Sequence, residues 1–170
     1  GAPTGAITPG WCKGGASVAG TADGFMTTPQ GIISDGTYLY VSEQGNYRVG
    51  RYLASDGSAQ GWIGNSQGTF ATGFQTADKA NLSASTEAYF NWAEGITNDG
   101  TYLYIADTGL NRIERFTLAG TYQGWIGKIN GIAATGGDPA CSGKSSQSTP
   151  GWCRGGNFTS SYSGEGGFNV

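Results

Sequence analysis

The sequence of 170 residues contains no histidine, few charges and no long apolar run. Without histidine, Ser-His-Asp and Cys-His arrangements lack their general base, so nucleophilic hydrolysis of either kind is excluded. The nine lysine and arginine residues are scattered, whereas nucleic acid and anionic membranes both attract clustered positive charge. No stretch approaches the roughly twenty apolar residues of a membrane-spanning helix. The sequence therefore predicts neither a nucleic-acid partner nor a membrane span.

Charged residues make up 12% of the sequence, about half the usual share, and the net charge is −3. Aromatic residues are plentiful instead, with five Trp, nine Tyr and seven Phe, so intrinsic disorder is not expected. We expect a polar surface that is rich in Gly, Ser, Thr and Asn and poor in Lys. This composition indicates an extracellular or cell-surface protein.

A segment of twenty-two residues occurs twice in the sequence. Gly31–Tyr52 reads GIISDGTYLYVSEQGNYRVGRY and Gly95–Phe116 reads GITNDGTYLYIADTGLNRIERF, with eleven identical positions and no gap. Each copy is followed by the tetrapeptide GWIG, at Gly61–Gly64 and at Gly124–Gly127. A repeat with a period of about sixty residues indicates an array of similar supersecondary units.

Each copy alternates apolar and polar residues as strands do. In the second copy we expect strands at Gly95–Thr97, Tyr102–Asp107, Arg112–Thr117 and Thr121–Gly127. The Asp99-Gly100 pair supplies the positive φ of a tight hairpin turn, and the first copy follows the same plan over Gly31–Gly64. Four short antiparallel strands repeated in series form the blades of a β-propeller. The expected fold is all-β, with two such blades making an incomplete propeller in one chain.

The repeated residues resemble the NHL repeat, whose blades combine Gly-Ile, an Asp, a Tyr-Val-Ala-Asp strand and an Asn-x-Arg-Ile turn. The first copy matches at Pro29, Gly31, Ile32, Asp35, Tyr40, Val41, Glu43, Arg48, Val49 and Tyr52, and the second at Gly95, Ile96, Asp99, Tyr104, Ile105, Ala106, Asp107, Asn111, Arg112, Ile113 and Phe116. The first copy departs from the pattern at Glu43, where Asp is usual, and at Tyr47, which stands at the Asn position. The match covers about 68 of the 170 residues.

The resemblance implies a β-propeller that is not an enzyme. Lyases and amidating enzymes similar to NHL propellers hold a metal ion through histidines, and this chain has none. We therefore expect no catalysis, no metal and no cofactor. A metal-dependent lyase or hydrolase is the third-ranked alternative.

The repeat divides the chain into five parts. Residues 1–30 form an N-terminal Cys-type linker, 31–64 blade 1, 65–94 an inter-blade insertion, 95–127 blade 2, and 128–170 a Cys-type linker that leads to a next blade. Both connecting segments are longer than those that usually join NHL blades. Insertions on a rigid scaffold are where recognition tends to reside.

Two blades leave both flanks of the array without a neighbour, whereas closed propellers have about four to eight blades. The chain also begins and ends in the same type of linker, because TPGWCKGG at Thr8–Gly15 returns as TPGWCRGG at Thr149–Gly156. We therefore expect the chain to be part of a longer propeller or to join copies of itself head to tail. About three copies would give six blades, and a contact that fails to close would give a filament.

Three cysteines occur in these linkers. Cys141 and Cys153 are expected to form a local disulfide in an oxidising compartment. Cys12 is the repeat equivalent of Cys153 and has no partner, which makes it an unpaired thiol or, alternatively, a reactive or intermolecular one. Asn81 and Asn157 each begin a glycosylation triplet.

The acidic residues of the repeat are interpreted as structural. Asp35 and Asp99 precede glycine in the turns and are expected to cap them, while Glu43 and Asp107 are expected to pair across their hairpins with Arg48 and Arg112, respectively. Acid-pair hydrolysis would require two carboxylates to converge on one cleft. A residue that recurs at the same place in each blade is more often structural than catalytic.

The tryptophans are the strongest candidates for recognition. Trp62 and Trp125 recur in the last strand of each blade and are expected to pack between sheets. The candidate ligand-binding residues are Trp11, Lys13, Asn91, Trp92, Trp152, Arg154 and Asn157. A flat aromatic ring beside polar side chains suits a sugar, although Trp11 and Trp152 would equally serve to hold a loop on the propeller.

These observations predict a non-enzymatic, extracellular NHL-like propeller for recognition or adhesion, which binds glycan or protein through aromatic-rich loops between its blades. The alternative is a self-associating building block of a filament or surface layer. The two differ in their main partner, which is a foreign molecule in the first case and the chain itself in the second.

Overall fold

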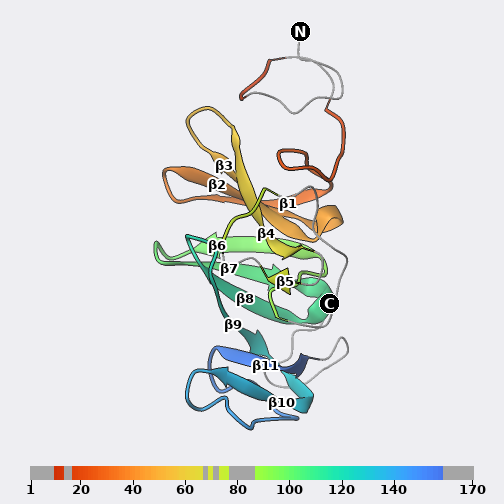
Figure 1. Ribbon diagram of the computed structural model, residues 1–170, viewed down its shortest axis with the longest axis vertical. Helices are drawn as coiled ribbons and strands as arrows, with labels where there is room; N and C mark the ends of the chain where they lie inside the picture. Colours follow the sequence, from red (N-terminus) through yellow and green to blue (C-terminus); the bar gives the residue numbers. More distant parts are fainter. Residues whose placement is uncertain (1–9, 14–16, 67–68, 71–72, 77–86, 159–170) are drawn as a thin grey trace.

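A computed structural model describes residues 10–13, 17–66, 69–70, 73–76 and 87–158. Two antiparallel sheets follow one another along the long axis of the molecule, with the N-terminal segment beyond the first and the hairpin of the last two strands beyond the second (Figure 1). In the described part of the chain the helical elements are two short 3-10 turns, η1 (Gln44–Asn46) and η2 (Thr108–Leu110). The expected all-β class is confirmed, and the two sheets match an incomplete propeller.

The first sheet has the order β1-β2-β3-β4-β5. Its strands are β1 (Pro29–Ser34), β2 (Tyr38–Glu43), β3 (Arg48–Leu53), β4 (Ala59–Ser66) and the two-residue β5 (Thr69–Phe70). The repeat supplies the same four strands to the second sheet: β6 (Ala93–Asn98), β7 (Tyr102–Asp107), β8 (Arg112–Thr117) and β9 (Tyr122–Gly127). The second and third of these have the bounds that the alternation predicts.

The Asp-Gly turns show why the hairpins form. Oδ1 of Asp35 accepts hydrogen bonds from the backbone N–H groups of Thr37 and Tyr38, at 2.8 and 2.7 Å. Asp99 accepts two equivalent bonds, both at 2.8 Å, and the glycine that follows each aspartate has a positive φ, of 96° and 87° respectively. At Asp99 a hydrogen bond from the Tyr104 hydroxyl, together with the backbone bonds, holds the pKa below the usual value. At Asp35 partial burial raises the pKa, but the backbone bonds and a hydrogen bond from the Tyr40 hydroxyl outweigh this effect, so the pKa is lowered. The two aspartates therefore cap their own turns, as expected.

The segment that we expected to be a linker after residue 127 continues the second sheet. β10 (Ile129–Gly137) and β11 (Cys153–Phe158) pair with each other, and Cys153 pairs with Trp125 of β9, so the order becomes β10-β11-β9-β8-β7-β6. Gly124 permits this approach, since a Cβ there would lie 2.7 Å from the carbonyl oxygen of Cys153. The outer edge of the blade is thereby paired with backbone instead of left open.

The first sheet uses its insertion in the same way. The backbone of Gln75 exchanges two hydrogen bonds of 2.9 Å with that of Trp62 on β4. Gly61 stands where Gly124 stands in the second sheet, and a Cβ on it would lie 2.8 Å from the carbonyl oxygen of Gln75. In each blade, the outer strand therefore pairs with a backbone segment that follows the blade in the chain.

The two sheets pack face to face. We call face A the side that carries Leu39 and Tyr52 in the first sheet and Leu103 and Phe116 in the second, and face B the opposite side. Face B of the first sheet lies on face A of the second, and one buried cluster contains Tyr40, Val49 and Ile63 together with Leu103, Ile105 and Phe116. Hydrogen bonds also cross between the sheets, including one of 2.5 Å from Ser42 Oγ to the carbonyl oxygen of Glu94.

Candidate functional site

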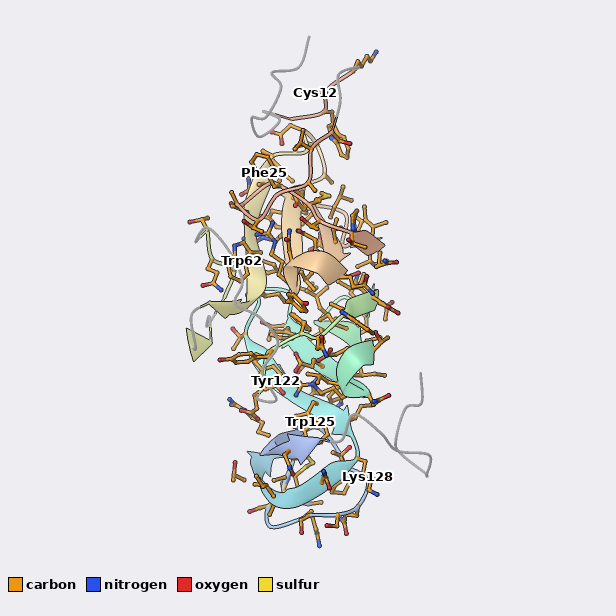
Figure 2. The ribbon with its side chains drawn as sticks, turned by 90° about the vertical axis from the view of Figure 1, so that its right-hand side faces the viewer. Cys12, Phe25, Trp62, Tyr122, Trp125 and Lys128 are labelled. Atoms are coloured by element: carbon orange, nitrogen blue, oxygen red, sulfur yellow. A yellow bond between two sulfur atoms is a disulfide. The ribbon has the colours of Figure 1, made fainter. Side chains whose placement is uncertain are left out.

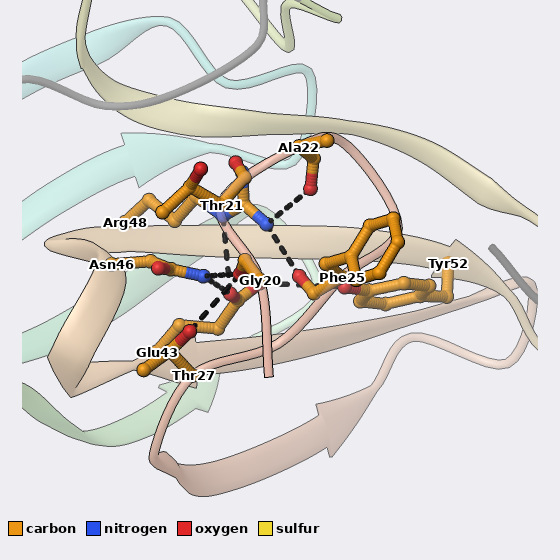
Figure 3. Close-up of polar contacts among 9 residues, drawn as sticks. All are labelled: Gly20, Thr21, Ala22, Phe25, Thr27, Glu43, Asn46, Arg48 and Tyr52. Carbon is orange, nitrogen blue, oxygen red and sulfur yellow. Dashed lines mark hydrogen bonds and ion pairs between the residues drawn. The ribbon is translucent and has the colours of Figure 1, made fainter. Parts of the chain in front are cut away.

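The first buried charge cluster is centred on Arg48 (Figure 3). Its Nε lies 3.1 Å from Oε2 of Glu43, and both side chains are almost completely buried. The rest of the guanidinium donates to the carbonyl oxygens of Thr21, Ala22 and Phe25, at 2.8, 3.0 and 2.5 Å. The Arg48 cluster therefore fastens the preceding linker to face A of the first sheet.

The second cluster places two carboxylates around one guanidinium. Arg112 lies 3.1 Å from Asp107 and 2.5 Å from Glu114, and it donates to the carbonyl oxygen of Tyr89 at 2.5 Å. The side chains of all three charged residues are 0% exposed. Burial raises the pKa of Glu114 well above its usual range and that of Asp107 to about 6, while Arg112 opposes both shifts.

Glu114 has no counterpart in the first sheet, where Gly50 stands at that position. A Cβ on Gly50 would lie 2.6 Å from Oε1 of Glu43 and 2.9 Å from Cε2 of Tyr52, so a side chain there would have to displace one of them. The longer Glu43 thus fills in the first sheet the space that Asp107 and Glu114 share in the second. The sequence shows that Glu114 replaces the glycine of the first copy, but it does not show that Glu114 is buried.

Both ion pairs expected from the repeat, Glu43 with Arg48 and Asp107 with Arg112, are present. Their acids are closed off from solvent, so they cannot reach a substrate in this conformation. Within the described ranges, no three His, Cys, Asp or Glu residues are placed to hold a metal ion. In this structure both clusters bury their charged side chains and connect each hairpin to the linker before it.

The raised pKa of Glu114 makes the stability of the folded chain depend on pH. The raised pKa means that Glu114 binds its proton more tightly in the folded chain than in the unfolded one. Its contribution to stability is therefore complete below the ordinary pKa and is lost as pH rises towards the folded-state value. We expect Glu114→Gln to match the parent near about pH 4 and to be about 2 kcal/mol more stable near about pH 8.

Urea unfolding of both proteins at the two pH values measures this difference. An equal difference in unfolding free energy at both pH values would contradict a raised pKa of Glu114, because a purely steric effect does not depend on pH.

The structure does not bring the candidate ligand-binding residues together. Cys12, next to Trp11 and Lys13, lies at one end of the molecule, and Lys128, which begins the β10–β11 region, lies near the other (Figure 2). Trp92 lies between them, directly before β6. These residues therefore lie at three separate locations on the molecule and do not form one pocket.

The C-terminal candidates are occupied by local contacts. The Trp152 ring packs on Tyr104, with 5.5 Å between centroids, and lies 4.4 Å from the guanidinium carbon of Arg115. Arg154 pairs with Glu87 at 3.6 Å, and Oδ1 of Asn157 accepts the backbone N–H of Ile132 at 2.8 Å. These contacts agree with the alternative in which Trp152 holds its segment on the propeller.

The sequence did not predict one repeated feature, an arginine that lies between two aromatic rings in each sheet. The guanidinium carbon of Arg51 lies 4.7 Å from the Tyr38 ring and 4.0 Å from that of Phe74. Arg115 lies in the same way between Tyr102 and Trp152, at 4.7 and 4.4 Å. Phe74 and Trp152 are thus structural equivalents, although the sequences around them differ. The Tyr and Arg that are identical in the two copies are the sequence signal from which this stack could have been predicted.

The remaining candidates have mixed outcomes. Cys141 and Cys153 form the expected disulfide, and Cys12 is an exposed free cysteine. Trp125 belongs to the cluster between the sheets, whereas Trp62 is buried on face A beneath Arg48, 5.6 Å from its guanidinium carbon. Asn81 lies outside the described residues.

No protein-family model and no curated protein matches this chain. The resemblance to NHL repeats therefore rests on the residues quoted above and remains a prediction. What the fold defines is a class, an all-β protein with two propeller-like blades. None of the helical segments described here is long and apolar enough to cross a membrane.

Proposed function

We propose that the protein is a non-enzymatic, extracellular recognition or adhesion module that binds carbohydrate through an exposed aromatic ring between its blades. The observation that carries this proposal is Trp92, whose side chain is 50% exposed on a backbone segment held by several hydrogen bonds. A disulfide and a sparsely charged sequence support the extracellular setting.

The segment that presents Trp92 is anchored to the second sheet. The Trp92 carbonyl oxygen accepts hydrogen bonds from the backbone N–H and Oγ1 of Thr108, at 3.2 and 2.9 Å. The N–H of Asn91 donates to the buried carboxylate of Asp107 at 2.8 Å, and its carbonyl oxygen accepts the N–H of Gly109 at 2.8 Å. Because this backbone is already held, binding at Trp92 would not have to order it.

The fold does not require an indole at this place. Thr28 is the equivalent residue of the first sheet, and its carbonyl oxygen accepts the N–H of Gln44 at 3.1 Å. Both residues have a left-handed backbone, with φ of 50° for Thr28 and 67° for Trp92, which costs a non-glycine residue about 1 kcal/mol. A large exposed ring on a strained backbone, where a threonine serves the sheet equally well, supports a role in binding.

The surroundings of Trp92 suit a sugar. Asn91 and Glu94 flank Trp92 in the sequence, and Nε2 of Gln44 in η1 donates to Oε1 of Glu94 at 2.9 Å. An aromatic face covers the apolar side of a pyranose, while amide and carboxylate groups bond its hydroxyls. A protein ligand is the other outcome that a binding screen would reveal.

Trp92→Thr tests the proposal, because threonine is the residue that the first sheet carries. We expect glycan-array signal and calorimetric affinity to fall roughly tenfold or more, with an unchanged melting temperature. Trp92→Tyr is the matched control and should retain much of the affinity, since it keeps an aromatic face. An array on which the parent protein binds no glycan, or an unchanged affinity in Trp92→Thr, would contradict the proposal.

A further inference from the structure

Two faces of the described sheets carry no other sheet, face A of the first and face B of the second. On the open face A, Ile32 is 63% exposed, whereas its equivalent Ile96 packs against the core. On the open face B, Tyr104, Ile113 and Ile126 are only partly buried. Their equivalents in the first sheet, Tyr40, Val49 and Ile63, are 0%, 0% and 1% exposed. These four side chains are therefore more exposed than their equivalents in the other copy.

The contact between the two sheets of this chain shows what fits each face. Phe74, stacked on face B of the first sheet, and Ile63 lie against Gly120 in the last turn of the second. A Cβ on Gly120 would lie 2.8 Å from Cγ2 of Ile63 and 2.9 Å from Cδ2 of Phe74. Gly57 is the equivalent of Gly120, and Trp152 is the equivalent of Phe74. The chain thus contains the glycine and the aromatic ring of a second such contact, Gly57 on the first sheet and Trp152 on the second.

The open face A is hollow and apolar. A cavity of about 410 Å³ lies on it, lined by Trp11, Met26, Ile32, Leu39, Val41 and Tyr52 among others. Leu39, Val41 and Tyr52 are the equivalents of Leu103, Ile105 and Phe116, on which face B of the first sheet packs. The cavity therefore lies where the side chains of a neighbouring face B would insert.

Trp11 already fills the aromatic position of this contact. A Cβ on Gly57 would lie 3.2 Å from the Trp11 ring, just as Gly120 meets Phe74. The backbone N–H of Trp11 donates to the carbonyl oxygen of Asp56 at 2.7 Å. Trp11 is also the sequence counterpart of Trp152, because both follow Thr-Pro-Gly and precede Cys. The position over Gly57 thus accommodates a tryptophan ring, which is the side chain that Trp152 on face B of a second sheet would place there.

We infer that face A of the first sheet binds face B of the second sheet in another copy of this chain, head to tail. The partner's Trp152 takes the place over Gly57 that Trp11 holds, so docking displaces Trp11. The polar pair Gln44–Glu94 of the internal contact is replaced by Thr108 and Gln30, and no like charges meet there. This self-association goes beyond the proposed carbohydrate binding and does not use the Trp92 ring.

Sedimentation velocity over a range of concentrations tests the inference with exposed residues that the fold tolerates changing. Ile32→Asp puts a charge into the docking face and should weaken self-association by about thirtyfold or more. Ile132→Asp is the matched control, because Ile132 is 64% exposed on β10, outside the four repeated strands that carry each docking face, and it should leave association unchanged. Trp11→Ala frees the place over Gly57 and should tighten association roughly tenfold.

A mixing experiment establishes the head-to-tail arrangement. Ile32→Asp blocks face A and Ile113→Asp blocks face B, so each variant alone should be monomeric. An equimolar mixture retains one intact pair of faces and should form a dimer that grows no further. Circular dichroism checks folding, and Ile126→Asp replaces Ile113→Asp if the latter does not fold.

The inference is overturned if the parent and Trp11→Ala are both monomeric at every concentration up to the solubility limit. It is also overturned if Ile32→Asp and Ile132→Asp weaken association equally, or if the mixture of blocked variants stays monomeric. A discrete ring or an open polymer of the parent each supports the docking contact, because both are built from it.

Discussion

Near neutral pH, Arg112→Ala is expected to destabilise the protein by about 3–5 kcal/mol, since it leaves the buried carboxylate of Asp107 without a counter-charge. Asp107 and Glu114 both lie against this guanidinium with side chains that are 0% exposed, and Tyr89 loses the donor to its carbonyl oxygen. Urea unfolding followed by tryptophan fluorescence measures the loss. We expect the loss to be smaller near about pH 4, where both carboxyl groups are neutral.

Arg115→Ala is the matched control for this prediction. Arg115 lies three positions further along β8, on the opposite face, and contacts the Tyr102 and Trp152 rings. Its truncation should cost about 1 kcal/mol, the usual range for a cation–π contact. Equal losses for the two arginines would show that the Arg112 cluster is hydrated and not buried.

Removing the disulfide is expected to cost about 3 kcal/mol, the value for a cross-link that closes a loop of this size. Cys141 and Cys153 are twelve residues apart and both 0% exposed. Cys153 belongs to β11 and pairs with Trp125 of β9, so the loss should reach the second sheet and not only a loop. Thermal unfolding of the Cys141→Ser/Cys153→Ser variant and hydrogen exchange of the β9 amides test this.

Cys12→Ser is the control for the disulfide, because Cys12 is an exposed free thiol and its loss should leave the melting temperature unchanged. If the double variant is as stable as Cys12→Ser, the cross-link contributes nothing to the folded state. If the β9 amides keep their protection from exchange in the double variant, β11 does not support that edge.

The repeat and its alternation predicted the blades well because both are local signals. Tyr102–Asp107 and Arg112–Thr117 begin and end as strands where the period-two pattern does. The Asp-Gly turns and the two Glu/Asp–Arg pairs also follow from residues only a few positions apart. Such features need no knowledge of the distant chain.

β10 and β11 could not be predicted in this way. Ile129–Gly137 is rich in glycine and lacks alternation, and its pairing depends on Gly124 admitting the backbone of Cys153. The candidate ligand residues were scattered for a similar reason, since their shared linker sequence does not say which blade each linker packs against. Trp11 lies on Gly57, whereas its counterpart Trp152 lies on Arg115.

Local pattern alone was sufficient for the class of fold, the two repeated four-stranded units and the ion pairs within each hairpin, because alternation and short loops specify strands and their partners. Contacts between distant segments settled which face of each sheet is covered, that Glu114 is buried beside Asp107, and that Trp92 is exposed. Burial depends on which segments meet in space, and two nearly identical copies acquire different surroundings because each has a different neighbour.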